Sequence, residues 1–304
     1  MLKKLSLDIV EINKLASYDA KALVAKEESK FNSQIRRIAS QVVAGDKRII
    51  LISGASSSGK TTTSHILQNK LASLGVSSFV MSMDDFFVDR DTLPIREDGK
   101  HDIENLVALD VKAIRKCLGE ILSKGETKIP QFDFLTHKRK KEWKTCRMHG
   151  NEVVLMEGLH ALNPAIIDGL DVGKIFRLYI YCGGGYTYKE DNLLSPKDLR
   201  LLRRIIRDKR DRHAQILETL SLWDEVCKGE DNNVTPFIDM ADFKLNSFHS
   251  YELLLYKNLI AQEFKNFSDN KKIKMFLSAF QYVGYLSEDI LPSSSVIREF
   301  VGYN

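Results

Sequence analysis

The sequence predicts an α/β protein in which a parallel β-sheet forms the core and helices cover both of its faces. Two observations predict this class. Short apolar runs alternate with longer segments whose apolar residues recur at helical spacing. The first apolar run leads through a glycine-bounded loop directly into a helical segment, which is the connection that parallel strands need. Because ligands bind such sheets beyond the carboxyl ends of the strands, we expect the functional residues to follow the strands directly.

The elements follow in order from the N-terminus. Residues 1–47 are predicted to form a helical N-terminal extension, since Phe31, Ile35, Ile38 and Val42 recur at helical spacing before Gly45 breaks the pattern. Residues 48–304 are predicted to form the main domain. Its predicted strands are 49–53, 76–82, 152–156, 176–182 and 242–245, and its predicted helices are 60–74, 110–123, 196–227 and 250–267.

The composition excludes several classes of protein. Of the 304 residues, 43% are hydrophobic and 28% charged, as in ordinary globular proteins, and a net charge of +4 is too small to indicate nucleic-acid binding. The four cysteines form no Cys-x-x-Cys pair, which indicates reduced thiols and not disulfides or a zinc site. No signal peptide and no apolar run of membrane-spanning length is visible. We therefore expect a cytoplasmic protein without a membrane partner.

Residues 54–61 read Gly-Ala-Ser-Ser-Ser-Gly-Lys-Thr and fit the pattern G-x-x-x-x-G-K-[ST] at every fixed position. In such a loop the backbone N–H groups point at phosphate oxygens, the lysine reaches the β- and γ-phosphates and the threonine hydroxyl ligates Mg²⁺. A glycine-rich turn without a ligand is the alternative, but a strand precedes this loop and a helix follows it. The sequence therefore predicts the P-loop NTPase fold with ATP and Mg²⁺. The predicted nucleotide-binding residues are Gly54, Ala55, Ser56, Ser57, Ser58, Gly59, Lys60, Thr61 and Thr62.

Two carboxylates follow other predicted strands. Asp84 follows the second strand, where it can accept the proton of a hydroxyl group that attacks the γ-phosphate. A capping role is the alternative, and the adjacent Asp85 leaves open which of the two faces the site. Glu157 ends the third strand and is predicted to bind or orient Mg²⁺ together with Thr61, with an ordinary strand-end glutamate as the alternative.

Six arginines crowd segment 196–213, which we expect to form a helical lid: Arg200, Arg203, Arg204, Arg207, Arg210 and Arg212. Guanidinium groups stabilise the charge that spreads over a transferring phosphoryl group, and a closing helix excludes water. The alternative is a solvated charged face whose arginines pair with Asp198, Asp208 and Asp211.

Aromatic residues alternate with polar residues in segment 132–139, which contains Phe132, Phe134 and His137. This mixture suits a flat, hydroxylated ligand such as a nucleoside, although a lone histidine is more often structural. The segment is predicted to be a small acceptor-binding insertion. Phe87, close to Asp84, is a further candidate for contact with the acceptor.

Together these motifs resemble the uridine kinase/phosphoribulokinase family of P-loop kinases, and in particular uridine-kinase-like proteins with an extra N-terminal region. The resemblance runs from about Arg48 to the C-terminus, where residues 295–300 are similar to the end of the longer relatives. It implies that Asp84 is the catalytic aspartate. It also implies that Asp102, in His-Asp-Ile-Glu at 101–104, holds the ribose hydroxyls.

The resemblance further implies that segment 132–137 recognises the base and that Arg204, Arg207 and Arg212 contact phosphate. Two positions depart from the family pattern: Phe132 replaces a tyrosine, and Ala214 stands where many relatives carry another lid arginine. These departures leave the acceptor open, because one hydrogen-bonding group can change a pocket's preference by orders of magnitude.

The function that these features predict is phosphorylation of the 5′-hydroxyl of a pyrimidine nucleoside by ATP, with Lys60, Asp84, Arg204 and Arg207 as catalytic residues. A second hypothesis keeps the reaction but changes the acceptor to another sugar or to pantothenate. A third is a nucleotide-binding regulator with little transfer activity. Relatives are often oligomeric, which leaves a homo-oligomer as an open alternative.

Overall fold

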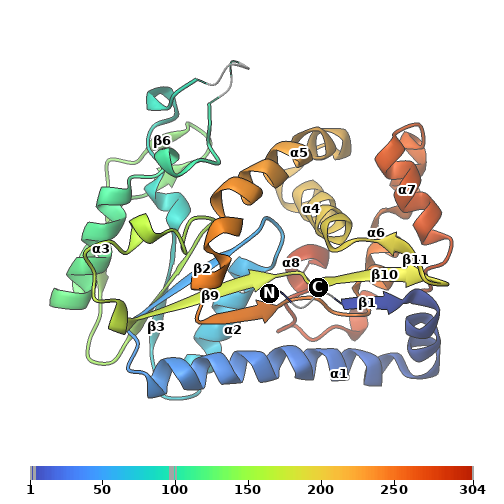
Figure 1. Cartoon of the computed structure of the whole chain (residues 1–304), viewed down its shortest axis with the longest axis horizontal. Coiled ribbons are helices and arrows are strands. Elements are labelled where there is room, and N and C mark those ends of the chain that lie inside the picture. Colours follow the sequence, from blue (N-terminus) through green and yellow to red (C-terminus); the bar gives the residue numbers. More distant parts are fainter. Residues whose placement is uncertain (1, 3–4, 96–98, 100, 303–304) are drawn as a thin grey trace.

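The computed structural model describes residues 2, 5–95, 99 and 101–302. Five parallel strands form the central sheet in the order β12-β9-β2-β8-β3 (Figure 1). They are β2 (Ile49–Gly54), β3 (Ser78–Ser82), β8 (Val153–Glu157), β9 (Ile175–Tyr181) and β12 (Phe243–Asn246). The predicted fold class is confirmed, and each predicted strand lies within two residues of an observed one.

Both faces of this sheet are covered, which explains why its strands are almost continuously apolar. Ile50 and Ile52 of β2 pack in one core with α1 (Ile9–Ala44) and α2 (Lys60–Ala72). Ile49 and Leu51 pack in a second core with α3 (Val111–Lys124). Successive side chains of a strand point to opposite faces, so β2 contributes to both cores.

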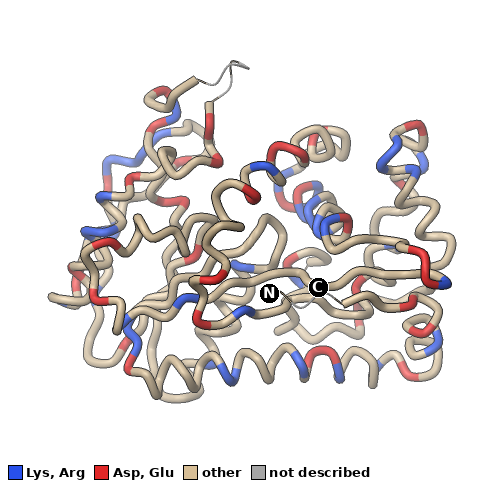
Figure 2. Tube along the Cα trace, in the orientation of Figure 1, with Lys and Arg blue, Asp and Glu red and all other residues tan. Residues whose placement is uncertain are grey.

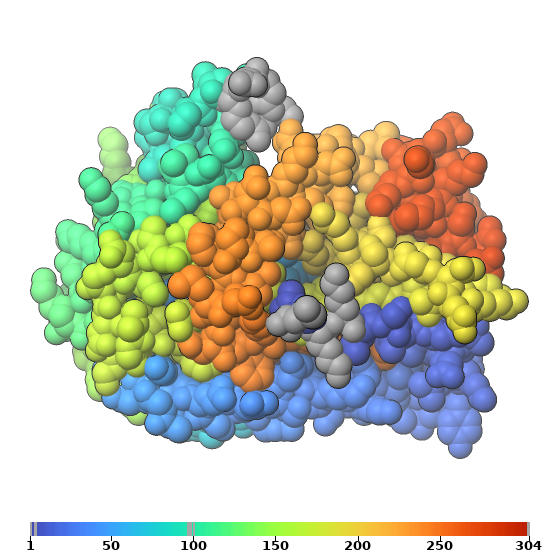
Figure 3. All heavy atoms as spheres, in the orientation of Figure 1, coloured from blue at the N-terminus to red at the C-terminus, as the bar shows by residue number. Residues whose placement is uncertain are grey.

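The N-terminal segment holds the predicted helix and also a strand that the sequence pattern did not reveal. Strand β1 (Leu5–Asp8) pairs in parallel with β10 (Gly184–Tyr188), which pairs in turn with β11 (Asp191–Leu194) in a small second sheet. Helix α1 runs along one edge of the molecule (Figure 3). Its apolar stripe, including Phe31 and Ile38, belongs to the same core as β2, so this segment folds against the sheet.

The prediction of one helical pattern over 196–227 was wrong. Two helices occupy the region, α4 (Pro196–Arg212) and α5 (Ile216–Asn233). Helix α4 begins with a capping box formed by Ser195 and Asp198 and ends at His213, whose φ of 53° is left-handed. A left-handed residue interrupts the helical hydrogen bonds, and no glycine or proline marks the break in the sequence. The remaining helices are α6 (Glu252–Phe264), α7 (Lys271–Phe280) and α8 (Arg298–Val301).

The predicted insertion lies between α3 and β8. It contains two antiparallel pairs, β4 (Glu126–Ile129) with β7 (Lys144–Arg147) and β5 (Phe132–Asp133) with β6 (Lys138–Arg139). Arg139 fastens the insertion near the carboxyl end of β3. Its guanidinium donates to the carbonyl oxygens of Phe87 (2.8 Å) and Phe86 (3.0 Å) and to the carboxylate of Asp110 (3.0 Å). Within the described residues, no helix combines the length and the apolar character that a membrane crossing requires.

Candidate active site

The predicted phosphate loop lies between the carboxyl end of β2 and the first residue of α2. A Cβ atom at Gly54 would lie 2.4 Å from the carbonyl oxygen of Ile180, and Gly59 has a φ of 92°, so both positions require glycine. The hydroxyls of Ser57 and Ser58 are buried, and neither has a hydrogen-bond partner among the described residues. Buried hydroxyls without partners are costly. Phosphate oxygens in the loop would satisfy them, so the cradle fits a polyphosphate.

Lys60 is folded back onto the loop. Its Nζ donates to the carbonyl oxygens of Gly54 (2.9 Å) and Ala55 (3.1 Å). Burial lowers the pKa of Lys60, while the negative charges of Glu157, Glu299 and Asp84 oppose that shift. The ammonium group of Lys60 is therefore desolvated and lies in the field of three carboxylates. A bound phosphate group would be a closer negative partner for it.

The two adjacent aspartates face different surroundings. Both follow β3, and Ser82 Oγ accepts a hydrogen bond from the Asp84 backbone N–H at 3.2 Å. Desolvation raises the pKa of Asp84, although the residue is exposed, and the charge of Lys60 opposes this rise. Desolvation also raises the pKa of Asp85, which accepts a backbone hydrogen bond from Phe132 in the insertion. Asp84 thus faces the phosphate loop, whereas Asp85 supports the insertion.

Glu157 lies at the end of β8, beside Ile52 of β2. It accepts a hydrogen bond from Ser82 Oγ at 3.3 Å, and burial raises its pKa to about 7. No three His, Cys, Asp or Glu side chains in the described part of the chain are grouped so that they could hold a metal ion by themselves. A carboxylate and a threonine hydroxyl next to the phosphate loop suit Mg²⁺, which keeps several waters and uses substrate phosphates with one or two protein ligands. Thr61, exposed at the start of α2, and Glu157 are the residues that would hold it.

Helix α4 presents its arginines to the phosphate loop, and Figure 2 shows basic residues gathered along it. Arg204 Nη1 donates to Ser56 Oγ at 2.8 Å. Arg200 Nη1 donates to the carbonyl oxygen of Ser56 (3.4 Å), and Arg203 Nη1 donates to that of Ser57 (3.3 Å). This part of the predicted lid is therefore in contact with the loop.

The buried carboxylate of Asp208 forms ion pairs with the three arginines that were predicted to contact phosphate. Arg207 lies 2.7 Å from it, Arg204 3.2 Å and Arg212 3.5 Å. The alternative hypothesis expected these arginines to pair with aspartates on a solvated face. The pairing with Asp208 is present, but the carboxylate of Asp208 is buried. Arg207 also lowers the pKa of Lys60, which places it in the electrostatic field of the loop.

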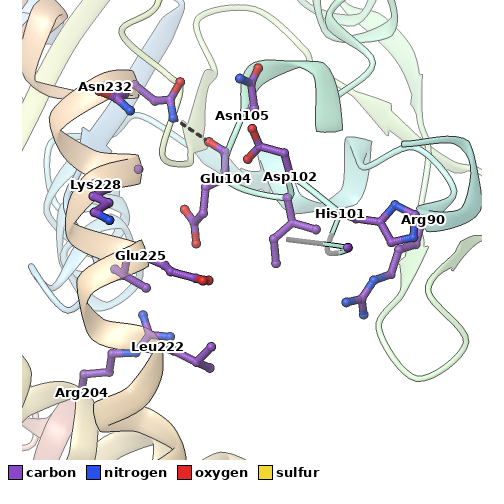
Figure 4. Close-up of a pocket in the computed structure, with 15 residues that line it drawn as sticks. Arg90, His101, Asp102, Glu104, Asn105, Arg204, Leu222, Glu225, Lys228 and Asn232 are labelled. Atoms are coloured by element: carbon purple, nitrogen blue, oxygen red, sulfur yellow. Dashed lines mark hydrogen bonds between the residues drawn. The ribbon is translucent and has the colours of Figure 1, made fainter. Parts of the chain in front are cut away.

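A cavity of about 680 Å³ lies next to this charged cluster (Figure 4). Segment 101–105 forms one wall and helix α5 the other, with Arg204 at one end. Asp102, predicted to hold the ribose hydroxyls, and Arg204, predicted to contact phosphate, both line this cavity. The side chains of the walls are mostly polar or charged: Arg90, His101, Asp102, Glu104, Asn105, Arg204, Glu225, Lys228, Asn232 and Asn233.

The aromatic residues predicted to recognise the acceptor do not line this cavity. Phe87, Phe132 and Phe134 pack on one another, with ring centroids 5.2–6.4 Å apart. His137 is exposed, and its Nε2 lies 3.2 Å from Nη1 of Arg90. Arg90 lines the cavity, so segment 132–139 is connected to the cavity only indirectly, through the contact between His137 and Arg90.

Several residues of the site were missed by sequence reasoning. Glu104 lines the cavity, and burial raises its pKa, with the charge of Arg204 opposing. Asn233 Nδ2 donates to the carbonyl oxygen of Glu104 at 3.0 Å, which joins the two walls. His160 is buried next to them without a partner for Nδ1, and burial lowers its pKa to about 4. His160 could have been predicted as a site residue, because it follows Glu157 by three positions and so comes directly after a strand of the sheet. No pattern in the sequence indicated that α5 lies beside segment 101–105.

Part of this chain is similar to known proteins. Residues 49–181 match the model of the Phosphoribulokinase / Uridine kinase family. The uridine kinase of Ligilactobacillus salivarius is 28% identical over 181 residues, which cover 59% of this chain and 75% of that protein. The uridine kinase of Macrococcus caseolyticus is 26% identical over 219 residues, covering 66% of this chain and 96% of that protein.

Among solved structures, a possible uridine kinase from Bacillus stearothermophilus aligns with 71% of this chain and 100% of its own, at 19% identity and a TM-score of 0.46. The family match covers the phosphate loop, both aspartates at the end of β3, the insertion and Glu157. Through this segment, the chain is similar to the Phosphoribulokinase / Uridine kinase family.

Proposed function

We propose that this protein transfers the γ-phosphoryl group of ATP to a hydroxyl group of a small metabolite, and that the 5′-hydroxyl of a pyrimidine nucleoside is the acceptor. The observation that carries the proposal is the position of Asp84. Its carboxylate lies in the field of Lys60 at the carboxyl end of the sheet, close to the cavity that Glu104 and Asp102 line.

In the proposed reaction, the acceptor oxygen forms a bond to the γ-phosphorus, the bond from that phosphorus to the bridging oxygen of ADP breaks, and the hydroxyl proton passes to Asp84. A raised pKa suits this role, because it brings the basicity of the carboxylate closer to neutral pH. Lys60, Arg204 and Arg207 would stabilise the charge on the transferring group. When bound, Mg²⁺ supplies charge neutralisation to the phosphates.

Support for a nucleoside comes from the family match and from the volume of the cavity. A second acceptor class is favoured by a different observation. The phenylalanines of the insertion pack on one another, and the lining of the cavity is rich in carboxylates and amides. Such a lining also suits a polyhydroxylated acceptor without a base, because each hydroxyl can pair with a buried polar group.

The test is the release of ADP from ATP and Mg²⁺ with a panel of acceptors: uridine, cytidine, adenosine, ribulose 5-phosphate and pantothenate. We expect uridine or cytidine to give the highest kcat/KM. Turnover of a sugar phosphate or pantothenate without turnover of any nucleoside would favour the second class. If the protein binds ATP but forms no ADP with any acceptor, the chain is a nucleotide-binding regulator and the proposal is wrong.

A further inference from the structure

The C-terminal segment 295–301 lies against the phosphate loop. A Cβ atom at Gly59 would come within 2.9 Å of Cγ2 of Val296. Glu299 accepts a hydrogen bond through Oε2 from the backbone N–H of Thr62 at 3.2 Å. This N–H belongs to the first turn of α2, whose unpaired donors and positive dipole attract phosphate. A carboxylate of the chain itself therefore occupies a donor that a bound nucleotide needs.

Other elements hold the backbone of this segment in place. Arg210 of α4 donates to the carbonyl oxygens of Glu299 (3.0 Å) and Phe300 (2.8 Å). Ser295 Oγ donates to the buried carboxylate of Glu28 in α1 at 2.5 Å. The N-terminal helix thus anchors the segment that lies over the nucleotide site.

Arg298 fixes the same segment from within. Its buried guanidinium donates to the carbonyl oxygens of Leu291 (2.7 Å), Gly302 (3.2 Å) and Glu288 (3.2 Å). Glu299, by contrast, is only half-buried, whereas the residues on either side of it are buried. The backbone is therefore fixed, and the side chain of Glu299 is the part that can move.

We propose that Glu299 is an anionic gate on the donor site: its carboxylate competes with the phosphates of the nucleotide for the N-terminus of α2 and must swing away before they bind. This inference depends on the proposed function, because it requires the loop to bind a polyphosphate. A triphosphate carries more negative charge than a carboxylate, and Lys60 also attracts it, so the nucleotide displaces the side chain. Since the backbone stays in place, every binding event includes this displacement, and Glu299 lowers the affinity for nucleotide.

The gate predicts how substitutions change nucleotide affinity. In the full-length protein, Glu299→Gln keeps an acceptor oxygen but removes the charge, and Glu299→Ala removes both. We expect each to tighten binding of a non-hydrolysable ATP analogue with Mg²⁺ by about three- to tenfold in calorimetry. Adenosine, which has no phosphate, should bind these variants and the parent protein equally. Glu288→Gln makes the same change of net charge near the C-terminus and should leave both affinities unchanged.

The outcomes separate the gate from the proposed function. Equal or weaker binding of the ATP analogue to Glu299→Gln, in a variant with the parent's circular dichroism spectrum, would overturn the gate alone. Weaker binding of the ATP analogue to Glu299→Ala would likewise overturn the gate, because it would mean that Glu299 contributes positively to nucleotide binding. If the parent protein and both variants bind no nucleotide, the proposed function fails, and the gate fails with it.

Discussion

Nε of Arg203 lies 2.7 Å from Oε2 of Glu252, and both side chains are fully buried. A second bond, from Nη2 to Oε1 at 2.9 Å, makes the pair bidentate. Arg203 also donates to the phosphate loop at Ser57, and Glu252 accepts from the hydroxyl of Tyr256 at 2.7 Å. One arginine of the predicted lid therefore joins α4, α6 and the loop and has a structural role that its neighbour Arg204 does not share.

Removing that arginine should destabilise the whole domain. Arg203→Met leaves Glu252 as a buried charge without its cation, which should lower the free energy of unfolding by roughly 3–5 kcal/mol in urea titrations. Arg212→Met is the matched control on the same helix. Its side chain is 60% exposed, so its loss should change the stability by less than about 0.5 kcal/mol. Similar losses in the two variants would contradict a structural role specific to Arg203.

Substitutions of the two adjacent aspartates should affect different kinetic constants. Asp84→Asn removes the proposed proton acceptor, so kcat should fall at least about 100-fold while the affinity for ATP changes little. Asp85→Asn alters a carboxylate that supports the insertion, and it should act mainly on the KM of the acceptor. Steady-state kinetics with the best acceptor, together with direct titration of ATP, would measure both. A larger loss of kcat in the Asp85 variant would assign the base to the other residue.

Helix α5 should determine how well the acceptor binds. At Gly229 an added Cβ would lie 3.0 Å from Cβ of Glu104, so close that the facing cavity wall must yield by a few tenths of an ångström. Gly229→Ala should therefore raise the KM of the acceptor about tenfold, with a smaller effect on ATP. Gly119→Ala in α3 is the control, because its Cβ would meet Leu170 at an ordinary 3.5 Å. An unchanged KM in the Gly229 variant would exclude α5 from the acceptor site.

His160 should make the protein sensitive to acid. Burial lowers its pKa from 6.5 to about 4, while the backbone of Glu104 and the charge of Asp102 oppose the shift. Between pH 6.5 and about pH 4, the unfolded chain binds more protons at His160 than the folded chain does. The free energy of unfolding therefore falls as the pH falls through this range. From pH 7 to pH 5, the parent should lose about 2 kcal/mol of unfolding free energy relative to His160→Gln.

Urea titrations of both proteins across this pH range would test the prediction. Glutamine can still donate to the backbone of Glu104 but does not titrate. A constant difference in stability between the two proteins would show that His160 is protonated equally in the folded and unfolded states.

Much of the fold was predictable because its signals are local. The apolar runs that became β2, β8 and β9 are buried on both faces, and the phosphate loop carries its chemistry in contiguous residues from Gly54 to Thr61. Where the local signal was weak, the prediction failed. The break at His213 depends on one left-handed residue, and β1 is a short strand whose partner β10 lies far along the chain.

By itself, the sequence determined the parallel sheet, the position of the phosphate loop and the acidic residues at the strand ends, because strand and helix periodicity and the loop motif are properties of neighbouring residues. Only the tertiary structure decided which aspartate faces Lys60 and which arginine is buried. It also decided that α5 forms a wall of the cavity and that Glu299 reaches the N–H of Thr62, a residue 237 positions earlier in the chain. Those contacts join distant segments. Packing and charge in the folded chain select them, and no pattern along the sequence encodes them.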